Sequence, residues 1–533
     1  MVVFRHIVYL SLISVSAWSQ TNRYVISFRD KNNTPYSISQ PQEFLSSRAI
    51  QRRSRIAFQV TPDDLPVTPS YVTGLSATGA KVFFTSRWMN AALVEASPAI
   101  VDLINGLPFV TKSELVAPGK KLSGGRSKQR KQRQVTSAAE VTAPQLQMLG
   151  IDKMQADGFN GDGIIVSVLD AGFPGVNTTA PFQTIFTEGR IQFTQDYITN
   201  SGNVYQFDAH GTEVFSVIAA QLQGIYTGGL SKASYLLFVT EDVTSEYRVE
   251  EYNWLLAAEK ADSAGTDLIH ASLGYNLFDD SQMDYRISEL DGKTAVISRA
   301  AGMARDRGII VVVSAGNEGT NAWHYITPPA DVDGILATGA VNASKVKVAF
   351  SSFGPSSDGR IKPDVAALGQ SVTVIQPNGT TGMSSGTSLA APLVTSLAAG
   401  LLQAYPNLTP AEIVSAIKLS ASQAGAPDNQ LGFGIPNYTA VKNYIGASRL
   451  SEEVVVFPNP ANATLHLAFK QLPGDQVELT FHDALGKPLS NPAVSVDWLN
   501  NPIEISISNL AAGIYFLHVR TAEYRKSFRF VKF

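Results

Sequence analysis

The chain has 533 residues, of which 44% are hydrophobic and 16% are charged, with a formal net charge of -3. This length predicts two to four domains, and the composition is that of a globular rather than a disordered protein. The small net charge argues against a nucleic-acid or membrane-surface footprint, and the absence of cysteine excludes disulfides, thiolate metal sites and a cysteine nucleophile.

Residues 1–19 have the pattern of a secretory signal peptide. Arg5 precedes a short apolar run, and Ala17-x-Ser19 forms a small-residue cleavage site before Gln20. A short buried helix would have a similar composition, but the run is too short to span a bilayer and no other stretch contains about twenty apolar residues. We expect an exported protein without a membrane-spanning segment in its mature form.

Residues 20–118 are predicted to form a small α+β domain. Segments 23–28, 81–84 and 91–96 have strand composition, and a short helix is expected over 98–105, where proline occupies the first position.

The composition changes sharply at residues 119–138, which predict an exposed linker. Gly, Ser and Gln dominate there without an aliphatic pattern. The segment contains seven basic residues: Lys120, Lys121, Arg126, Lys128, Arg130, Lys131 and Arg133. A nucleic-acid patch would have this charge, but a hinge sensitive to proteolysis is favoured, because such sites concentrate in exposed polar segments.

Residues 139–447 alternate apolar strands with helices, such as those expected over 252–264 and 297–307. The predicted strands are Ile164–Leu169, Tyr235–Val239, Asp267–Ser272 and Ile309–Ser314. Strands that are hydrophobic on both faces indicate an α/β fold whose parallel sheet is covered by helices on both sides. Sites in such sheets lie beyond the carboxyl ends of the strands, where Asp170 is found.

Residues 452–533 contain strands without helices and predict a small β-sandwich. The expected strands are Val454–Phe457, Leu465–Phe469, Val477–His482, Ile503–Ile507 and Ile514–Val519.

Ser388 precedes an apolar, alanine-rich helix expected from Leu389 to about Tyr405. A serine at a helix start is ordinarily a cap. Asp170 at a strand end and a histidine at a helix start change this interpretation, because a hydroxyl nucleophile needs a base and the base needs an orienting carboxylate.

The base is found by elimination among seven histidines. His6 lies in the signal peptide, His324 lies in a loop, and His270 lies inside an apolar strand, where a hydrogen-bonded core imidazole is favoured. The default for the histidines of the C-terminal strands, His466, His482 and His518, is the protein surface. His210 remains, in Asp208-Ala-His-Gly-Thr at the start of a helix.

Ser384 competes with Ser388, because Gly382-Met-Ser-Ser-Gly386 matches the G-x-S-x-G nucleophile elbow. That elbow requires a preceding buried strand and a histidine later in the same domain. Residues 376–381 are expected to form a turn-rich loop, and the next histidine, His466, lies in another domain. We therefore interpret the match as coincidental.

Four blocks together resemble the signatures of subtilisin-like serine proteases, in the order of that family. They are Asp170-Ala-Gly, His210-Gly-Thr, Ser314-Ala-Gly-Asn317 and Gly386-Thr-Ser-Leu-Ala-Ala-Pro392. The resemblance implies a subtilisin-like parallel sheet, with Ser388 as nucleophile, His210 as general base and acid and Asp170 as its orienter. It also implies that Asn317 and the N–H of Ser388 bind the oxyanion, and a helix N-terminus favours negative charge at that point.

Two further segments resemble the substrate-binding strands of the family. They comprise Ser272, Leu273, Gly274, Ser314, Ala315 and Gly316, although tight sheet packing would require similarly small residues. Ala171 and His270 depart from the residues usual in the family, but neither departure removes a catalytic group.

The remaining regions suggest maturation and export. Residues 20–118 resemble, more weakly, the inhibitory propeptide of these enzymes. The C-terminal region resembles the sorting domain of type IX secretion cargo, through Phe457-Pro-Asn-Pro-Ala461, Asp483-x-x-Gly486, Leu510-x-x-Gly-Ile-Tyr-Phe516 and Lys532. We expect a proenzyme that reaches the outer-membrane surface or the medium through the type IX machinery.

The resulting prediction is a secreted serine endopeptidase that acts on proteins or peptides. Catalysis is expected to need no cofactor; structural calcium is compatible with the family, but no compact Asp-rich loop indicates it. The alternatives are a catalytically silent adhesin or binding module that retains the fold, and an esterase that uses Ser384.

Overall fold

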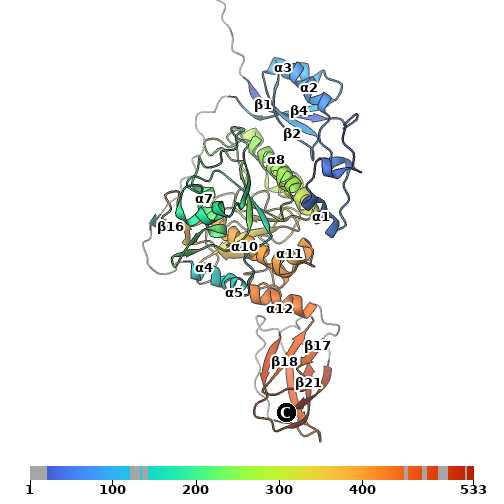
Figure 1. The fold of residues 1–533 in the computed structure, drawn as a ribbon, viewed down its shortest axis with the longest axis vertical. Coiled ribbons are helices and arrows are strands. Elements are labelled where there is room, and N and C mark those ends of the chain that lie inside the picture. The colour runs from blue at the N-terminus through green and yellow to red at the C-terminus, as the bar shows by residue number, and fades with distance from the viewer. Residues whose placement is uncertain are drawn as a thin grey trace, which may run out of the picture.

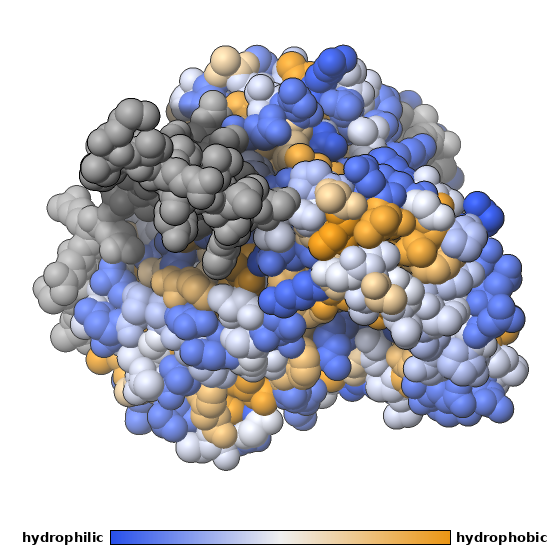
Figure 2. All heavy atoms as spheres, turned by 90° about the horizontal axis from the view of Figure 1, so that it is seen from above, coloured by the Kyte–Doolittle hydropathy of each residue, from blue (hydrophilic) through white to orange (hydrophobic). Residues whose placement is uncertain are grey.

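A computed structural model describes residues 21–119, 133–134, 142–448, 454–470, 477–489, 502–521 and 525–533. The predicted signal peptide and most of the basic linker lie outside these residues. Three bodies follow one another along the long axis of the molecule, with the N-terminal domain at one end and the C-terminal strands at the other (Figure 1). Figure 2 shows the N-terminal end, where hydrophilic side chains predominate around a hydrophobic patch.

The N-terminal domain is a four-stranded antiparallel sheet with three helices, in the strand order β2-β3-β1-β4. Its elements are β1 (Asn22–Phe28), α1 (Ser47–Arg55), α2 (Pro69–Ala77), β2 (Lys81–Ser86), β3 (Ala91–Ala96), α3 (Pro98–Asn105) and β4 (Val110–Ala117). Val25 of β1 and Leu93 of β3 contribute to the same hydrophobic cluster as Trp254 of the central domain. The N-terminal domain is therefore docked on the central domain through a shared core.

Charged groups reinforce this docking around Asp262, a fully buried residue of helix α8 (Val249–Ala264). Its carboxylate accepts hydrogen bonds from Arg52 at 2.5 Å and from Arg53 and Arg87 at 2.6 Å. A buried carboxylate is tolerated only when it is paired in this way, so the three arginines and Asp262 fix the orientation of the domain.

The central domain contains a seven-stranded parallel sheet in the order β14-β13-β12-β11-β6-β10-β7. The strands are β6 (Ile165–Asp170), β7 (Ile191–Asp196), β10 (Ser234–Val239), β11 (Leu268–Ala271), β12 (Ile310–Ser314), β13 (Leu336–Val341) and β14 (Val365–Leu368). The order reverses around β6, so the carboxyl ends of β10, β6, β11 and β12 border the crevice at which such sheets bind ligands.

Helices cover both faces of this sheet, as the sequence predicted. Helices α8 and α9 (Val296–Asp306) share one hydrophobic cluster with the sheet. The opposite face is covered by α4 (Ala143–Met148), α5 (Ile151–Ala156), α7 (His210–Ala219), α10 (Thr387–Ala404), α11 (Pro410–Leu419) and α12 (Tyr438–Ser448). The shorter elements of this domain are α6 (Gln183–Thr187), β8 (Gln221–Leu222) and β9 (Tyr226–Thr227).

Helix α10 is the core helix of the domain. It is long and apolar enough to cross a membrane, and it is the one such helix within the described ranges, but 89% of it is buried inside the protein. It begins two residues earlier than the sequence predicted, with Gly386 at the N-cap and without a side-chain cap. Ser388 is thus the second helical residue rather than a cap.

A second difference concerns the residues that precede Ser384. The turn-rich loop expected over 376–381 is observed at 376–380, but it connects the two strands of a hairpin. Strand β15 (Val372–Ile375) pairs with β16 (Thr381–Ser384), and β16 pairs on its other edge with β5 (Arg133–Gln134). Pro377-Asn-Gly379 was correctly interpreted as a turn. Turns of this composition also connect the two strands of a hairpin, so a strand follows it. Ser384 therefore ends a strand.

The C-terminal region contains two three-stranded antiparallel sheets around one hydrophobic cluster, which is a small sandwich. The strands are β17 (Val454–Phe457), β18 (Thr464–Phe469), β19 (Glu478–Asp483), β20 (Ile503–Ser506), β21 (Gly513–Arg520) and β22 (Arg525–Lys532). Sequence analysis missed β22. Four of its eight residues are basic, and only Phe530 and Lys532 are buried, so it lacks the apolar alternation of a core strand.

We expect the stability of the central domain to depend on pH because the carboxyl group of Glu251, in α8, is buried. Burial raises the pKa of Glu251 to about 7 from 4.5, against hydrogen bonds from Tyr285 and from the N–H of Ile297. A raised pKa means that the unfolded chain releases this proton first, so stability falls as pH rises from about 4.5 to about 7, by at most about 3 kcal/mol.

The substitution Glu251→Gln removes this titration while it retains a side-chain oxygen for Tyr285. We expect the variant to have a higher melting temperature than the wild type at pH 8 and a similar one at pH 4, measured by calorimetry across that range. A melting temperature lowered equally at both pH values would show that Glu251 contributes only packing.

Candidate active site

The carboxyl ends of the central strands surround a cavity of about 850 Å³. Residues predicted to act in catalysis or substrate binding contribute to its lining: His210, Ser272, Leu273, Gly274, Ser314, Gly316, Asn317 and Ser388. The tertiary structure therefore brings together groups that lie as far as 178 positions apart in the sequence.

Asp170 and His210 form the tightest contact at this site. Asp170 is the last residue of β6 and His210 is the first residue of α7, and their Oδ1 and Nδ1 atoms lie 2.6 Å apart. Because a carboxylate only accepts, Nδ1 carries the hydrogen, and in the neutral ring Nε2 has the lone pair that a base needs. The Nε2 atom has no hydrogen-bond partner within the described part of the chain.

Backbone groups hold this pair in position. The N–H of Ala171 donates to the carboxylate of Asp170 at 2.7 Å. This hydrogen bond uses the backbone of residue 171, so it does not depend on the alanine side chain. Asp208 accepts from the N–H of His210 and so satisfies an otherwise unpaired donor at the start of α7. Gly211 is required because a Cβ there would lie 2.2 Å from the carbonyl oxygen of Gly172.

Ser388 lies in the first turn of α10, where backbone N–H groups lack helical partners. Its hydroxyl donates to the carbonyl of Ser272 at 3.4 Å rather than to His210. The contact between nucleophile and base is thus open in this structure, as is common before a substrate binds. Both groups nevertheless line the same cavity.

Asn317 is oriented by the start of the same helix. Its Oδ1 accepts from the N–H of Thr387 at 2.9 Å and from the hydroxyl of that residue at 3.1 Å. Because the amide oxygen is occupied, the amide nitrogen is the group left for the cavity. Together with the N–H of Ser388 it forms a pair of donors at a helix N-terminus, where a developing negative charge is stabilised.

His270 is a structural residue in the geometry observed. Its ring nitrogens contact the hydroxyls of Thr395 at 2.8 Å and Ser272 at 3.0 Å, and Ser272 donates to the carbonyl of Ser388 at 2.8 Å. Burial lowers the pKa of His270 to about 3, so its ring is neutral at physiological pH. The neutral ring therefore supports the first turn of α10 through Ser272.

The expected substrate-binding residues are not equivalent. Gly274 must lack a side chain, because a Cβ there would lie 2.2 Å from the hydroxyl oxygen of Thr327. Ala315, in contrast, is absent from the cavity lining; its N–H donates to Thr338 and its carbonyl accepts from Thr327. Both backbone groups of Ala315 therefore already have a hydrogen-bond partner within the domain.

Two features of the cavity escaped sequence analysis. Ser384 and Ser385 line it, although Ser384 was discounted. Six carboxylates outside the quoted motifs also line it: Glu213, Glu241, Asp242, Glu246, Glu250 and Glu318. Only the run Glu241-Asp242 and the pair Glu250-Glu251 signalled them in the sequence.

Acyl transfer to a serine requires a hydroxyl, an oriented imidazole and donors for an oxyanion around one space. The class of protein that this fold and cavity define is the serine hydrolases.

The family is shown by comparison with known proteins. The model of the subtilase family matches residues 161–434, slightly more than half of the chain, and the chain belongs to this family. Residues 23–137 match the peptidase S8 propeptide domain of Bacteroidota, a match that includes most of the basic linker. Residues 455–532 match the secretion system C-terminal sorting domain, which confirms the prediction of an exported protein.

Characterised relatives match the central domain. Subtilisin DY of Bacillus licheniformis is 30% identical over 282 residues, 52% of this chain and 90% of the relative. Subtilisin amylosacchariticus of Bacillus subtilis subsp. amylosacchariticus is 29% identical over 275 residues, 51% of this chain, and the match spans only 64% of that relative. The epidermin leader peptide processing serine protease of Staphylococcus aureus has a similar fold, with a TM-score of 0.54, 15% identity and coverage of 80% of this chain and 98% of that one.

Proposed function

We propose that the protein is a secreted serine endopeptidase, made as a proenzyme, that hydrolyses peptide bonds of proteins through an acyl-enzyme. The observation that carries this proposal is the 2.6 Å contact between Asp170 and His210 in the cavity that Ser388 also lines. Every reacting group is a side chain or a backbone amide of the chain, so the proposed reaction includes no cofactor and no nucleic acid.

In the proposed reaction, Ser388 Oγ attacks the carbonyl carbon of the scissile bond and His210 Nε2 accepts the hydroxyl proton. The oxyanion accepts hydrogen bonds from Asn317 Nδ2 and from the N–H of Ser388. Collapse of the tetrahedral intermediate transfers the proton from His210 to the leaving amine. Water then repeats the sequence on the acyl-enzyme, while Asp170 holds the ring and stabilises its protonated form.

The flanking domains give the proposal its cellular context. The N-terminal domain is docked on α8 through Asp262, as expected for a propeptide that is removed after folding. We propose that the C-terminal sandwich presents the protein to the type IX secretion machinery, and that the active form acts at the outer-membrane surface or in the medium.

Covalent labelling tests the identity of the nucleophile. The purified full chain is expected to react with a fluorophosphonate, and peptide mass spectrometry should locate the adduct on Ser388. Ser384→Ala is the matched control, since it removes a serine from the same cavity. The Ser384→Ala protein should still be labelled on Ser388. Labelling that persists in Ser388→Ala, or an adduct on Ser384, would contradict the proposal in favour of the esterase alternative.

A further inference from the structure

Thr327 is a buried residue in the lining of the active-site cavity. Its side chain is 4% exposed, and its hydroxyl oxygen has no hydrogen-bond partner within the described part of the chain. A buried hydroxyl in this state is uncommon, because it has given up its hydrogen bonds with water without gaining others. The hydroxyl of Thr327 therefore has a hydrogen-bonding capacity that a ligand in the cavity can use.

This hydroxyl lies between the two segments that are expected to bind substrate. A Cβ on Gly274 would lie 2.2 Å from Thr327 Oγ1, and a Cβ on Gly316 would lie 3.0 Å from the same atom. The missing side chains of the two glycines thus make room for the threonine and not for a deep opening. Thr327 forms the floor of the space between Gly274 and Gly316.

Backbone hydrogen bonds hold this floor in place. The N–H of Thr327 donates to the carbonyl of Ala315 at 3.2 Å, and its carbonyl accepts from the N–H of Ala330 at 2.9 Å. The carbonyl of Pro328 accepts from the N–H of Tyr275 at 3.1 Å, so the segment is joined to both sides of the space. A large side chain could displace the floor only by breaking these bonds.

The position of the floor identifies the part of the substrate that it faces. Gly316 immediately precedes Asn317, the proposed oxyanion donor. On the other segment, the carbonyl of Ser272 accepts from the hydroxyl of Ser388 at 3.4 Å. The attacked carbonyl is therefore expected beside the space above Thr327. The side chain that enters this space is that of the residue to which the carbonyl belongs, on the acyl side of the scissile bond.

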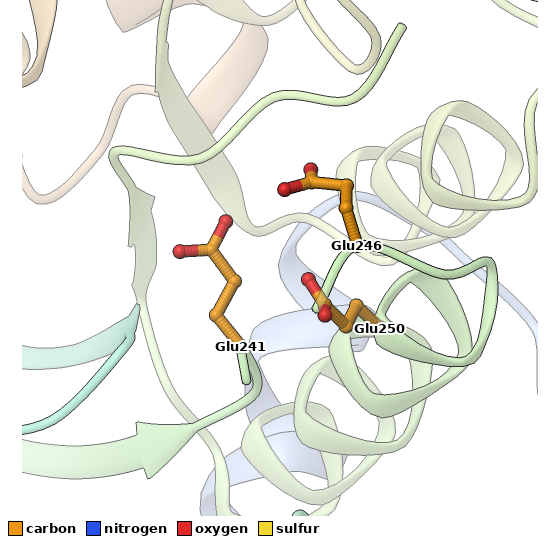
Figure 3. A group of neighbouring side chains, drawn as sticks. All are labelled: Glu241, Glu246 and Glu250. Atoms are coloured by element: carbon orange, nitrogen blue, oxygen red, sulfur yellow. The ribbon is translucent and has the colours of Figure 1, made fainter. Parts of the chain in front are cut away.

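The charge of the cavity restricts this side chain further. Carboxyl groups line other parts of the wall, and Figure 3 shows three of them, Glu241, Glu246 and Glu250. Neither lysine nor arginine is found in the described lining, so an acidic side chain would be repelled without such a residue to pair with. A neutral side chain avoids this repulsion.

We propose that Thr327 determines the specificity of the cavity by admitting a small neutral side chain on the acyl side of the scissile bond, with serine favoured. The inference rests on the proposed peptidase function and adds its substrate class. A serine hydroxyl can donate to Thr327 Oγ1 or accept from it, since each hydroxyl is both donor and acceptor. Alanine fits the same space without this bond, and a large aromatic side chain collides with the floor.

Cleavage of matched peptides by the purified protein, with its active sites titrated by a fluorophosphonate, tests this specificity. The peptides differ only in the residue on the acyl side, which is Ser, Ala, Phe or Asp. We expect kcat/KM to be at least about tenfold lower for Phe and for Asp than for Ala, because of misfit and of repulsion respectively. The value for Ser should exceed that for Ala by about threefold to tenfold, the usual contribution of one hydrogen bond between neutral groups.

Two substitutions separate the hydroxyl of Thr327 from its size. Thr327→Val keeps the shape of the side chain, and the fold should tolerate it because the lost hydroxyl has no partner in the described domain. In Thr327→Val we expect the Ser/Ala ratio of kcat/KM to fall to about 1 and the Ala/Phe ratio to stay unchanged. Thr327→Gly lowers the floor and should raise kcat/KM for the Phe peptide by at least about tenfold.

The matched control is Thr338→Val. Thr338 of β13 is also fully buried, its hydroxyl has no partner among the described residues, and it is absent from the cavity lining. Both ratios should be unchanged in Thr338→Val. The control separates an effect of Thr327 on substrate from a general effect of losing a buried hydroxyl.

The results that would overturn the inference differ from those that would overturn the proposed function. A wild-type rate for Phe equal to or above that for Ala, with fluorophosphonate labelling of Ser388 intact, would show that Thr327 does not close the space. A Ser/Ala ratio that Thr327→Val leaves unchanged would show that the hydroxyl does not contact substrate. Absence of labelling at Ser388 would overturn the proposed peptidase function, and the inference with it.

Discussion

Ser388→Ala is expected to lower kcat by about 10⁶-fold, the magnitude established for removal of the nucleophile in a subtilisin. His210→Ala should have a comparable effect, because without a base the hydroxyl of Ser388 is not activated. The double variant should be no slower than either single one, since both substitutions disable the same unit. Initial rates on a fluorogenic peptide, with active-site titration of the wild type, measure all three.

The control for this prediction is Ser384→Ala, which changes a serine in the same cavity and should reduce kcat by less than tenfold. Multiplicative losses in the Ser388→Ala, His210→Ala double variant would show that the two residues act independently. That result would contradict a shared proton transfer and, with it, the role assigned to the 2.6 Å pair of Asp170 and His210.

Asn317→Ala is expected to lower kcat by about 10²–10³-fold and to change KM little. Its amide nitrogen is proposed to donate only to the oxyanion, a charge that exists in the transition state and not in the bound substrate. Separate determination of kcat and KM on one peptide distinguishes this effect from a loss of substrate binding.

Asn317→Asp is the control that separates donation from positioning. The carboxylate retains an oxygen for the N–H of Thr387, which Asn317 Oδ1 accepts at 2.9 Å, but it has no amide donor. We expect Asn317→Asp to be at least as impaired as Asn317→Ala. Recovery of activity in Asn317→Asp would show that the residue serves only to hold the start of α10.

The proposed catalytic residues were largely predictable because each lies at the end of an element. Asp170 ends an apolar strand, and His210 and Ser388 begin helices; the elimination among the histidines and the resemblance to the subtilisin-like signatures then assigned their roles. The role of His270 was also anticipated: an imidazole within an apolar strand must find hydrogen bonds, and it does so with Thr395 and Ser272.

The errors arose where contacts are not local. The strand that ends at Ser384 was missed because its partners, β15 and β5, are needed to recognise it. Ala315, which was expected to contact substrate, is absent from the cavity lining, and its N–H and carbonyl pair with Thr338 and Thr327. Such pairings join residues that are distant in the sequence, so a local pattern does not reveal them.

The sequence by itself determined the order of domains and the parallel sheet, because periodicity and turn residues are local properties of a chain. The proposed catalytic residues followed from the resemblance of four short blocks to the subtilisin-like signatures. Only the tertiary structure decided which side chains share a cavity. Glu241, Glu246 and Glu250 belong to a strand end, a loop and a helix, and only the tertiary structure brings them together in the lining of the cavity that Ser388 also lines. Charge in a cavity depends on distances in space, which spacing along the chain does not encode.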